Sequence, residues 1–317
     1  MPGQQANEDS AISTTAPAPS PLVITGPTGW IGTAFLAQVA RASVQWPRGV
    51  TLFGSSARQV GAPDGTSFAM RSLDTIGPED VEGALILHLA YLTKEKVELL
   101  GERIFFDTNS AIDERLLAAC REGRPRGVFV ASSGAASLAQ QGRDRHLYGL
   151  CKLLQEDRFL DFGAKAGVPV LAGRIYNLGG PWINKRSAYA ISNMLVQAFD
   201  TGAVRINATV PVYRSYLHVE DLVALVLAGL GDGLSPGRPL DLCGAEIVEM
   251  AHVAEEVARV TGLGVSAIVR DALDYDHPAI YVGDPTQTLT LALRYGIRLR
   301  GLAAQVADTA LYLHEKR

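Results

Sequence analysis

The sequence predicts an α/β fold, a doubly wound parallel sheet with helices on both faces and a smaller C-terminal lobe. Short apolar, β-branched runs alternate with stretches of helical spacing over the first half of the chain. These runs are apolar at nearly every position, as is typical of strands that are buried on both faces of a sheet. A glycine-rich turn at residues 25–32 joins the first run to the first helical stretch.

Each predicted strand is a short run of apolar, mainly β-branched or aromatic residues. In chain order these runs are 22–24, 50–53, 84–89, 128–130 and 168–172. Each predicted helix is a longer stretch in which apolar residues recur every three or four positions. In chain order these stretches are 31–42, 94–121, 146–166, 188–200, 219–230 and 246–261.

The chain is expected to have three parts. Residues 1–20 are rich in Ala, Pro, Ser and Thr and lack an apolar segment, which predicts a flexible tail. Residues 21–176 carry the regular strand–helix alternation and form the main domain. Beyond that point prolines interrupt shorter elements, so residues 177–317 are expected to form a smaller lobe, interleaved with the last strands of the sheet.

Composition excludes several classes of protein. The 317 residues are 47% hydrophobic with a formal net charge of −4, which excludes disorder for the bulk and gives no basic field for nucleic acid. The apolar runs fall far short of the roughly 20 residues that a membrane span needs. The three cysteines (Cys120, Cys151 and Cys243) are too far apart for a disulfide framework or a metal site. We expect a cytoplasmic protein that binds no metal, membrane or nucleic acid.

The turn after the first strand has the chemistry of a phosphate cradle. Gly26, Gly29 and Gly32 follow a GxxGxxG spacing between a strand and a helix. The first permits a tight turn, the second lets the backbone approach a pyrophosphate, and the third lets the helix pack on the sheet. We therefore expect a Rossmann fold that binds a dinucleotide through this turn, with further contacts from Thr28, Trp30 and Ile31; the alternative is a purely structural turn.

The end of the second strand predicts which dinucleotide is bound. An acidic residue there would bind a free ribose hydroxyl, but this strand is followed by Ser55, Ser56 and Arg58. Two hydroxyls and a guanidinium can bind a 2′-phosphate through charge-assisted hydrogen bonds. NADP is therefore the favoured cofactor, and NAD is the alternative. If Arg58 does not contact the cofactor, it is simply a solvated loop residue.

A second motif predicts proton transfer. Tyr148 and Lys152 are four residues apart on a predicted helix and so share a face. A nearby ammonium favours the phenolate and is expected to lower the pKa of Tyr148. Ser132 and Ser133 follow the strand at 128–130, where a hydroxyl can orient a substrate oxygen. Hydride transfer to or from a nicotinamide would complete the reaction.

With these motifs the sequence resembles the extended short-chain dehydrogenase/reductase superfamily, and within it the NAD-dependent epimerase/dehydratase family that acts on nucleotide sugars. The resemblance spans about residues 21–300 and implies a set of site residues. Ser133, Tyr148 and Lys152 match the family's catalytic serine, tyrosine and lysine. Ser132 is the alternative catalytic serine if the alignment is shifted by one residue. The resemblance places Leu89, Ala90 and Asn109 at the cofactor, together with Tyr148 and Lys152. It places Asn177 and Arg214 at the substrate phosphates, and His218 within the Arg214 motif.

The chain departs from that pattern in three places. Gly134-Ala135 stands where 4,6-dehydratases carry an Asp-Glu pair, which disfavours water elimination. Tyr148 follows Ser133 by only 15 positions, which implies a trimmed loop over the sugar. No arginine clearly supplies the second diphosphate contact, for which Arg270 is a candidate.

Together these features predict an NADP(H)-dependent nucleotide-sugar epimerase or 4-keto-sugar reductase. The alternatives are a reductase of a non-nucleotide carbonyl compound and a non-catalytic protein that senses NADP. For Arg214, the alternative to phosphate binding is a salt bridge to the acidic lobe. The resemblance also implies a homodimer that forms through the helices at 94–121 and 146–166.

Overall fold

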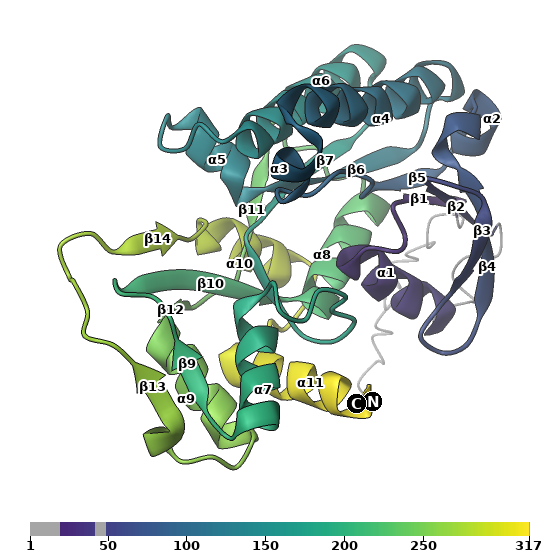
Figure 1. Cartoon of the computed structure of the whole chain (residues 1–317). Helices are drawn as coiled ribbons and strands as arrows, with labels where there is room; N and C mark the ends of the chain where they lie inside the picture. Colours follow the sequence, from purple (N-terminus) through teal and green to yellow (C-terminus); the bar gives the residue numbers. More distant parts are fainter. Residues whose placement is uncertain (1–19, 42–48, 317) are drawn as a thin grey trace, which may run out of the picture.

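The computed structural model describes residues 20–41 and 49–316. The predicted tail lies outside the described residues except for Ser20, and so does residue 42, the expected end of the first helix. A central sheet lies between two layers of helices, and the C-terminal elements form a further group beside it (Figure 1). This arrangement confirms the predicted doubly wound α/β fold.

Within the described residues the large sheet has eight strands in the order β11-β7-β6-β5-β1-β2-β4-β3. All neighbours are parallel except β3 and β4. The strands are β1 (Leu22–Thr25), β2 (Val50–Gly54), β3 (Arg58–Gly61), β4 (Ser67–Ser72), β5 (Leu85–His88), β6 (Gly127–Ser133), β7 (Val170–Ile175) and β11 (Leu240–Leu242). The chain crosses from β2 on one side of β1 to β5 on the other, so the carboxyl end of β1 is the switch point where ligands of such sheets bind.

Burial explains why β1 is central. All four of its residues are buried, and their side chains alternate between two hydrophobic clusters. Leu22 and Ile24 join the cluster that continues under the C-terminal elements, whereas Val23 joins the cluster under α4 and α6. The strand has no solvent-facing side, which is why its sequence is apolar throughout.

The helices cover both faces of the sheet. They are α1 (Trp30–Arg41), α2 (Pro78–Val81), α3 (Lys96–Leu100), α4 (Glu102–Gly123), α5 (Gly134–Gln140), α6 (Leu147–Ala166), α7 (Ala190–Thr201), α8 (Val219–Gly231), α9 (Met250–Val260), α10 (Pro285–Arg294) and α11 (Leu302–Glu315), with short 3₁₀ turns η2 (Leu73–Thr75) and η3 (Val265–Ala267). In Figure 1, α4 and α6 lie on one face of the sheet and α1 and α8 on the other. Within the described residues, every helix is too short or too polar to span a bilayer.

The residues after 176 belong to two structures. β11 extends the large sheet by pairing with β7, and α8 packs against α1. The remaining strands form small sheets: β8 (Asn177–Gly179), β10 (Val212–His218), β12 (Ile247–Glu249) and β14 (Ala279–Tyr281) in one, and β9 (Val204–Ile206) and β13 (Ile268–Arg270) in the other. α7, α9 and α11 pack together beside them. One hydrophobic cluster runs continuously across residue 176, and the division into domains there stays a prediction.

Two helix predictions were partly wrong, and one strand pair was missed. The helix expected over 246–261 begins only at Met250, because Ile247–Glu249 form β12 and pair with β10. The helix expected over 94–121 is broken at Gly101, whose φ of +81° ends α3 before α4 begins. The antiparallel pair β3–β4 was not predicted. The turn between these strands is closed by Asp64, which accepts hydrogen bonds from Thr66, and Gly65 follows it at a φ of +90°. The Pro63-Asp64-Gly65 run is the turn signal that could have revealed the pair.

Candidate active site

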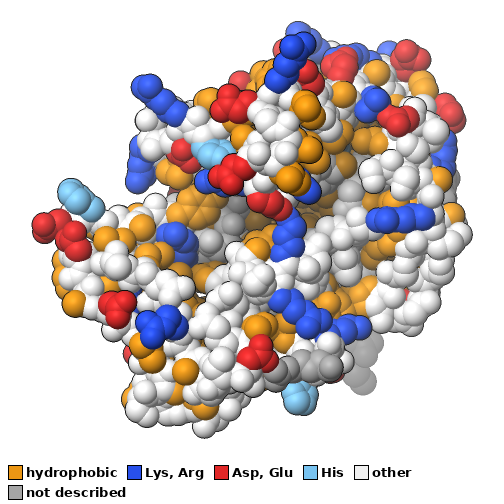
Figure 2. Space-filling model, viewed as in Figure 1, with side chains coloured by type: hydrophobic (Ala, Val, Ile, Leu, Met, Phe, Trp, Pro, Cys, Tyr) orange, Lys and Arg blue, Asp and Glu red, His pale blue; other side chains and the backbone are white. Residues whose placement is uncertain are grey.

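A pocket of about 530 Å³ opens at the carboxyl ends of the parallel strands. The glycine turn, the loop after β5, the end of β6, the start of α6 and β8 and β10 all contribute to its walls. In Figure 2 the same face of the molecule is hollowed between the large sheet and the C-terminal elements, with hydrophobic side chains inside the hollow. The position of this pocket is therefore the one that the fold predicts for a ligand.

The three glycines of the turn have different physical reasons to be glycine. Gly26 has a φ of +69°, and a Cβ on it would lie 2.7 Å from the backbone nitrogen of Ala90. A Cβ on Gly32 would lie 2.5 Å from the carbonyl oxygen of Gly26. A Cβ on Gly29 would meet only that same oxygen, at 3.7 Å. The fold thus requires Gly26 and Gly32, whereas Gly29 leaves open space before the N-terminus of α1, which fits a dinucleotide pyrophosphate.

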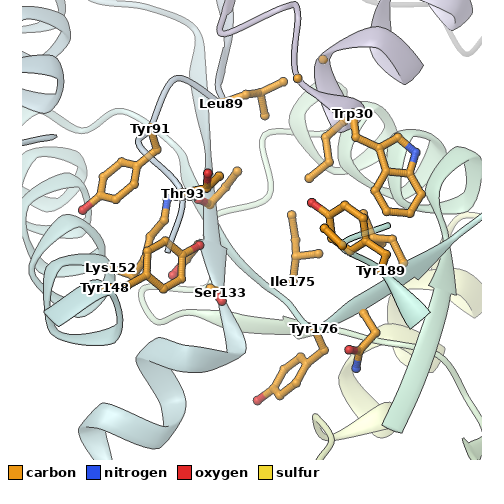
Figure 3. Close-up of a pocket in the computed structure, with 18 of the residues that line it drawn as sticks. Trp30, Leu89, Tyr91, Thr93, Ser133, Tyr148, Lys152, Ile175, Tyr176 and Tyr189 are labelled. Atoms are coloured by element: carbon orange, nitrogen blue, oxygen red, sulfur yellow. Dashed lines mark hydrogen bonds between the residues drawn. The ribbon is translucent and has the colours of Figure 1, made fainter. Parts of the chain in front are cut away.

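Ser133 and Tyr148 lie on the same side of the pocket (Figure 3). Ser133 ends β6 and caps α5, and its Oγ accepts a hydrogen bond from the Ala135 nitrogen at 3.2 Å and lies 3.3 Å from the Tyr281 hydroxyl. Burial raises the pKa of Tyr148, and a hydrogen bond with Ser133 acts in the opposite direction. The expectation of a lowered pKa is therefore wrong for this structure, because desolvation of the phenol outweighs its polar contacts.

The alternative serine has another role. Ser132 donates a hydrogen bond to Glu156, whose carboxylate also pairs with Arg174 at 2.7 Å. Glu156 is fully buried and Arg174 nearly so. Ser132 therefore belongs to a buried ion pair, and Ser133 is the serine that contacts Tyr148.

Lys152 is almost fully buried, and hydrogen bonds hold its ammonium in place. Its Nζ donates hydrogen bonds to the Ala131 carbonyl at 2.8 Å and to Gln155 Oε1 at 2.9 Å, and lies 3.5 Å from the centre of the Tyr91 ring. Burial lowers the pKa of Lys152 to about 7, and nearby carboxylates act against that shift. The ammonium is thus more readily deprotonated than an exposed lysine.

The opposite wall carries Asn177 and Arg214. Asn177 Nδ2 donates to the Ser215 carbonyl at 3.3 Å. The Arg214 guanidinium donates to the carbonyls of Tyr213 and Ala279, at 2.8 and 3.1 Å. In the part of the chain that the structure describes, Arg214 forms no ion pair, so the alternative of a salt bridge is not observed. A half-buried cation without a carboxylate is suited to an anionic ligand.

The profile of the NAD dependent epimerase/dehydratase family matches residues 22–238. The chain belongs to this family. Membership confirms the resemblance to the extended short-chain dehydrogenase/reductases and the expectation of an enzyme that uses a nicotinamide dinucleotide. No curated protein sequence is significantly similar to the chain.

Solved structures of similar fold have low sequence identity to this epimerase/dehydratase family member. A dTDP-glucose 4,6-dehydratase, DesIV from Streptomyces venezuelae, has 18% identity and a TM-score of 0.73, covering 94% of this chain and 98% of its own. UDP-N-acetylglucosamine 4-epimerase from Bacillus cereus has 18% identity and a TM-score of 0.69, with coverage of 93% and 96%. UDP-glucose 4-epimerase from Thermus thermophilus, in complex with NAD, has 18% identity and a TM-score of 0.70, with coverage of 93% and 99%.

Some predicted cofactor residues of this family member lie outside the pocket wall. Thr28 is exposed beside the pocket, and Ala90 lies behind Gly26. Asn109 is buried in α4, where its Oδ1 accepts a hydrogen bond from the Leu92 nitrogen at 2.8 Å, so it supports the loop after β5 from behind. Leu89 lines the pocket, as do the predicted glycine-turn residues Gly26, Gly29, Trp30, Ile31 and Gly32.

The predicted 2′-phosphate residues and two other candidates also lie elsewhere. Ser55, Ser56 and Arg58 are exposed beyond the carboxyl end of β2, away from the pocket wall. Arg270 forms a two-pronged ion pair with Glu249, with both contacts at 2.8 Å, which leaves its charge compensated. His218 is a structural residue, because its Nδ1 accepts from the Glu220 nitrogen and caps α8.

The sequence did not single out several aromatic residues that line the pocket. Tyr91, Tyr176, Tyr189 and Tyr216 come from four separate segments. The Tyr189 ring packs edge-on against Trp30 with centroids 4.9 Å apart, and Figure 3 shows this pair across the pocket from Tyr148. No short motif connects these tyrosines, and only their positions at strand ends could have suggested them.

Proposed function

We propose that the chain is an NADP(H)-dependent enzyme that epimerises a nucleotide sugar or reduces a 4-keto nucleotide sugar. The observation that carries this proposal is the composition of one pocket. Ser133, Tyr148 and Lys152 line it on one side, the glycine turn enters it from β1, and Arg214 faces it without a carboxylate partner. A hydride donor, a proton donor and an anion-binding group thus have places around one cavity.

Each side chain has a defined part in this chemistry. A bound nicotinamide supplies or accepts the hydride. The Tyr148 hydroxyl gives a proton to the substrate oxygen or takes one from it, and Ser133 orients that oxygen. Because burial keeps Tyr148 protonated, the site as described favours proton donation, which is the direction of ketone reduction. Lys152 contributes positive charge close to the proton donor.

A nucleotide sugar is the substrate class that the opposite wall supports. The planar guanidinium of Arg214 can bind two phosphate oxygens at once, and Asn177 offers an amide beside it. Tyrosine and tryptophan faces supply apolar surface for a sugar ring. The absence of a carboxylic acid at Gly134-Ala135 disfavours dehydration, which needs a proton donor for the departing hydroxyl.

The NADP preference rests on the residues after β2. Gly54-Ser55-Ser56-Ala57-Arg58 contains no carboxylate that would repel a 2′-phosphate, and Arg58 is exposed where β3 begins. Arg58→Ala should weaken binding of NADP and leave binding of NAD unchanged. Equal losses for both cofactors would contradict this assignment.

The decisive experiment is a thermal-shift panel of nucleotide sugars with NAD or NADP, followed by turnover of the compounds that stabilise the protein. Binding to the folded state raises the unfolding midpoint, and at a fixed ligand concentration the rise is larger for a tighter ligand. A lasting change in nicotinamide absorbance identifies a reductase, and product formation without such a change identifies an epimerase. If no nucleotide sugar raises the midpoint or is turned over, the proposal fails.

One observation favours a second candidate, the reduction of a non-nucleotide carbonyl compound. Several of the residues that form the pocket wall are aromatic, which also suits an apolar ketone. Substitution of Arg214 by alanine separates the two candidates. An unchanged KM would favour the non-nucleotide substrate, because that substrate has no diphosphate for the guanidinium to bind.

We also propose that the protein is a homodimer. Leu99, Ile104, Phe106 and Leu150 on α3, α4 and α6 are large apolar side chains that are 38–69% exposed. Together they place apolar surface on the helices expected to pair. Light scattering after size-exclusion chromatography measures the mass, and a monomer at all concentrations would contradict the proposal.

A further inference from the structure

A buried chain of hydrogen bonds leads from the glycine-turn strand to the catalytic lysine. Thr25 Oγ1 lies 2.9 Å from His88 Nδ1, and His88 Nε2 lies 3.0 Å from Asp113 Oδ1. Gln155 Nε2 donates to the same Asp113 oxygen at 2.6 Å, and Lys152 Nζ donates to Gln155 Oε1. All five side chains are at most 4% exposed, so water cannot substitute for any of these contacts.

Counting donors fixes the direction of every bond. Thr25 Oγ1 accepts from the backbone nitrogens of Leu89 and Ala90, at 3.2 and 3.1 Å, so its own hydrogen goes to His88 Nδ1. His88 is therefore the neutral tautomer that carries its hydrogen on Nε2 and donates it to Asp113. The lysine can only donate, so Gln155 turns its oxygen to Lys152 and its NH₂ group to Asp113. Both arms of the chain end on one carboxylate.

Asp113 is a buried carboxylate with no cation adjacent to it in the described part of the chain. Among the described residues no Lys or Arg lies within ion-pair distance of it, and its histidine partner is neutral. Glu156, the other carboxylate near Lys152, already pairs with Arg174. The cation closest to Asp113 along the hydrogen-bond chain is the Lys152 ammonium. Only the side-chain amide of Gln155 lies between the two groups. The titratable groups that face Lys152 are Tyr91 from the loop after β5, Asp113 from α4, and Tyr148, Cys151 and Glu156 from α6.

We propose that Asp113 and Gln155 are positioning residues of the active site, where Gln155 fixes the direction of the Lys152 ammonium and Asp113 supplies its counter-charge. The role rests on the proposed function, because Lys152 needs a fixed position and charge only if it takes part in catalysis. The other arm of the chain, through His88 and Thr25, ties the same carboxylate to the Leu89–Ala90 backbone beside Gly26. One buried anion therefore aligns the lysine with the floor of the cofactor site.

Asp113→Asn tests the charge alone. Both hydrogen bonds end on Oδ1, so an asparagine with its oxygen at that position keeps them and removes only the negative charge. The readout is the titration of Lys152 in cofactor-free protein, followed by NMR on lysine labelled with carbon-13 at Cε. The chain has six lysines, and the signal lost in Lys152→Met assigns the one of interest. The matched control is Asp107→Asn, the same change at an exposed position of α4.

We expect Asp113→Asn to move the Lys152 titration to lower pH by about one unit, because loss of an adjacent anion disfavours the ammonium. Asp107→Asn should leave it in place. Gln155→Met removes the hydrogen-bonded bridge between Lys152 and Asp113, and it should change the Lys152 chemical shift and lower its titration midpoint. If Asp113→Asn does not fold, Gln155→Met alone serves as the test. A Lys152 midpoint unaffected by both substitutions overturns the proposal.

Kinetics separate this proposal from the proposed function. If the protein turns over a nucleotide sugar, the alkaline limb of its pH–rate profile should move to lower pH in Asp113→Asn with KM unchanged. A merely structural role would lower kcat at every pH without moving the limb. The NMR titration needs no substrate, so Lys152 can respond as expected even when no nucleotide sugar is turned over, and the two proposals fail independently.

Discussion

Gly29→Ala should separate folding from cofactor binding at the glycine turn. The new methyl group would meet only the Gly26 carbonyl oxygen, at an ordinary contact distance of 3.7 Å. Its backbone also lies outside the left-handed region. The free energy of unfolding should therefore stay the same or rise by up to about 1 kcal/mol, because alanine restricts the unfolded chain more than glycine does.

Binding should respond in the opposite way. The methyl group would occupy the space through which a pyrophosphate approaches the N-terminus of α1, and loss of one charge-assisted hydrogen bond costs about 1.5–3 kcal/mol. That cost corresponds to about 10- to 150-fold weaker cofactor binding. Urea denaturation measures the stability, and calorimetric titration with NADP and NAD measures the affinity.

Gly32→Ala is the matched control for this prediction. A Cβ there would lie 2.5 Å from the Gly26 oxygen and 2.7 Å from Pro27, so the backbone must shift and stability should fall by about 1–3 kcal/mol. The reasoning is refuted if Gly29→Ala is destabilised as much as Gly32→Ala, or if it binds both cofactors as tightly as the unsubstituted protein.

Three further predictions concern the proton donor, the anion site and pH. Tyr148→Phe should lower kcat at least about 100-fold with cofactor affinity unchanged, as steady-state kinetics and calorimetry would show; unchanged turnover would remove Tyr148 from the mechanism. Arg214→Ala should raise KM for a nucleotide sugar about 10- to 100-fold and leave cofactor affinity unchanged, and a loss confined to cofactor affinity would misplace the anion site. Burial tends to raise the pKa of Glu249, but hydrogen bonds from Arg270 and two backbone amides prevail and lower it to about 2. Its stabilisation, up to about 3 kcal/mol, should be complete above about pH 4.5 and be lost as the pH falls towards 2, and Glu249→Gln should flatten that part of a denaturation–pH curve.

The local sequence was sufficient to predict a feature where one short segment determines both the backbone conformation and the functional side chains. The glycine spacing identified the turn after β1, and YxxxK identified a helix face with two polar groups. Neither pattern could decide between Ser132 and Ser133, because adjacent strand residues point to opposite sides. Only the packing of Glu156 and Arg174 shows that Ser132 is bound elsewhere.

The residues that sequence reasoning missed depend on contacts between distant segments. Asp113 lies 42 positions from Gln155, yet their side chains share a hydrogen bond. An isolated aspartate on a predicted amphipathic helix is ordinarily a surface residue, and nothing in the local pattern of α4 marks Asp113 as buried. Its role depends on α4 and α6 packing side by side over the sheet. The pocket tyrosines were missed for the same reason.

The distribution of charge explains how an acidic protein could present the proposed site for phosphates. The chain carries a net charge of −4, but among the described residues that line the pocket the only charged types are Lys152 and Arg214, and none is Asp or Glu. The two carboxylates that act on Lys152, Asp113 and Glu156, lie behind the wall, where each is held by internal hydrogen bonds. Their charges act on Lys152 through protein rather than on a ligand through water, so they hold a cation in place without repelling an anionic substrate. A carboxylate on the pocket surface would instead repel an anionic ligand directly. We therefore expect Asn177→Asp, which introduces a carboxylate there and nearly preserves side-chain shape, to weaken nucleotide-sugar binding.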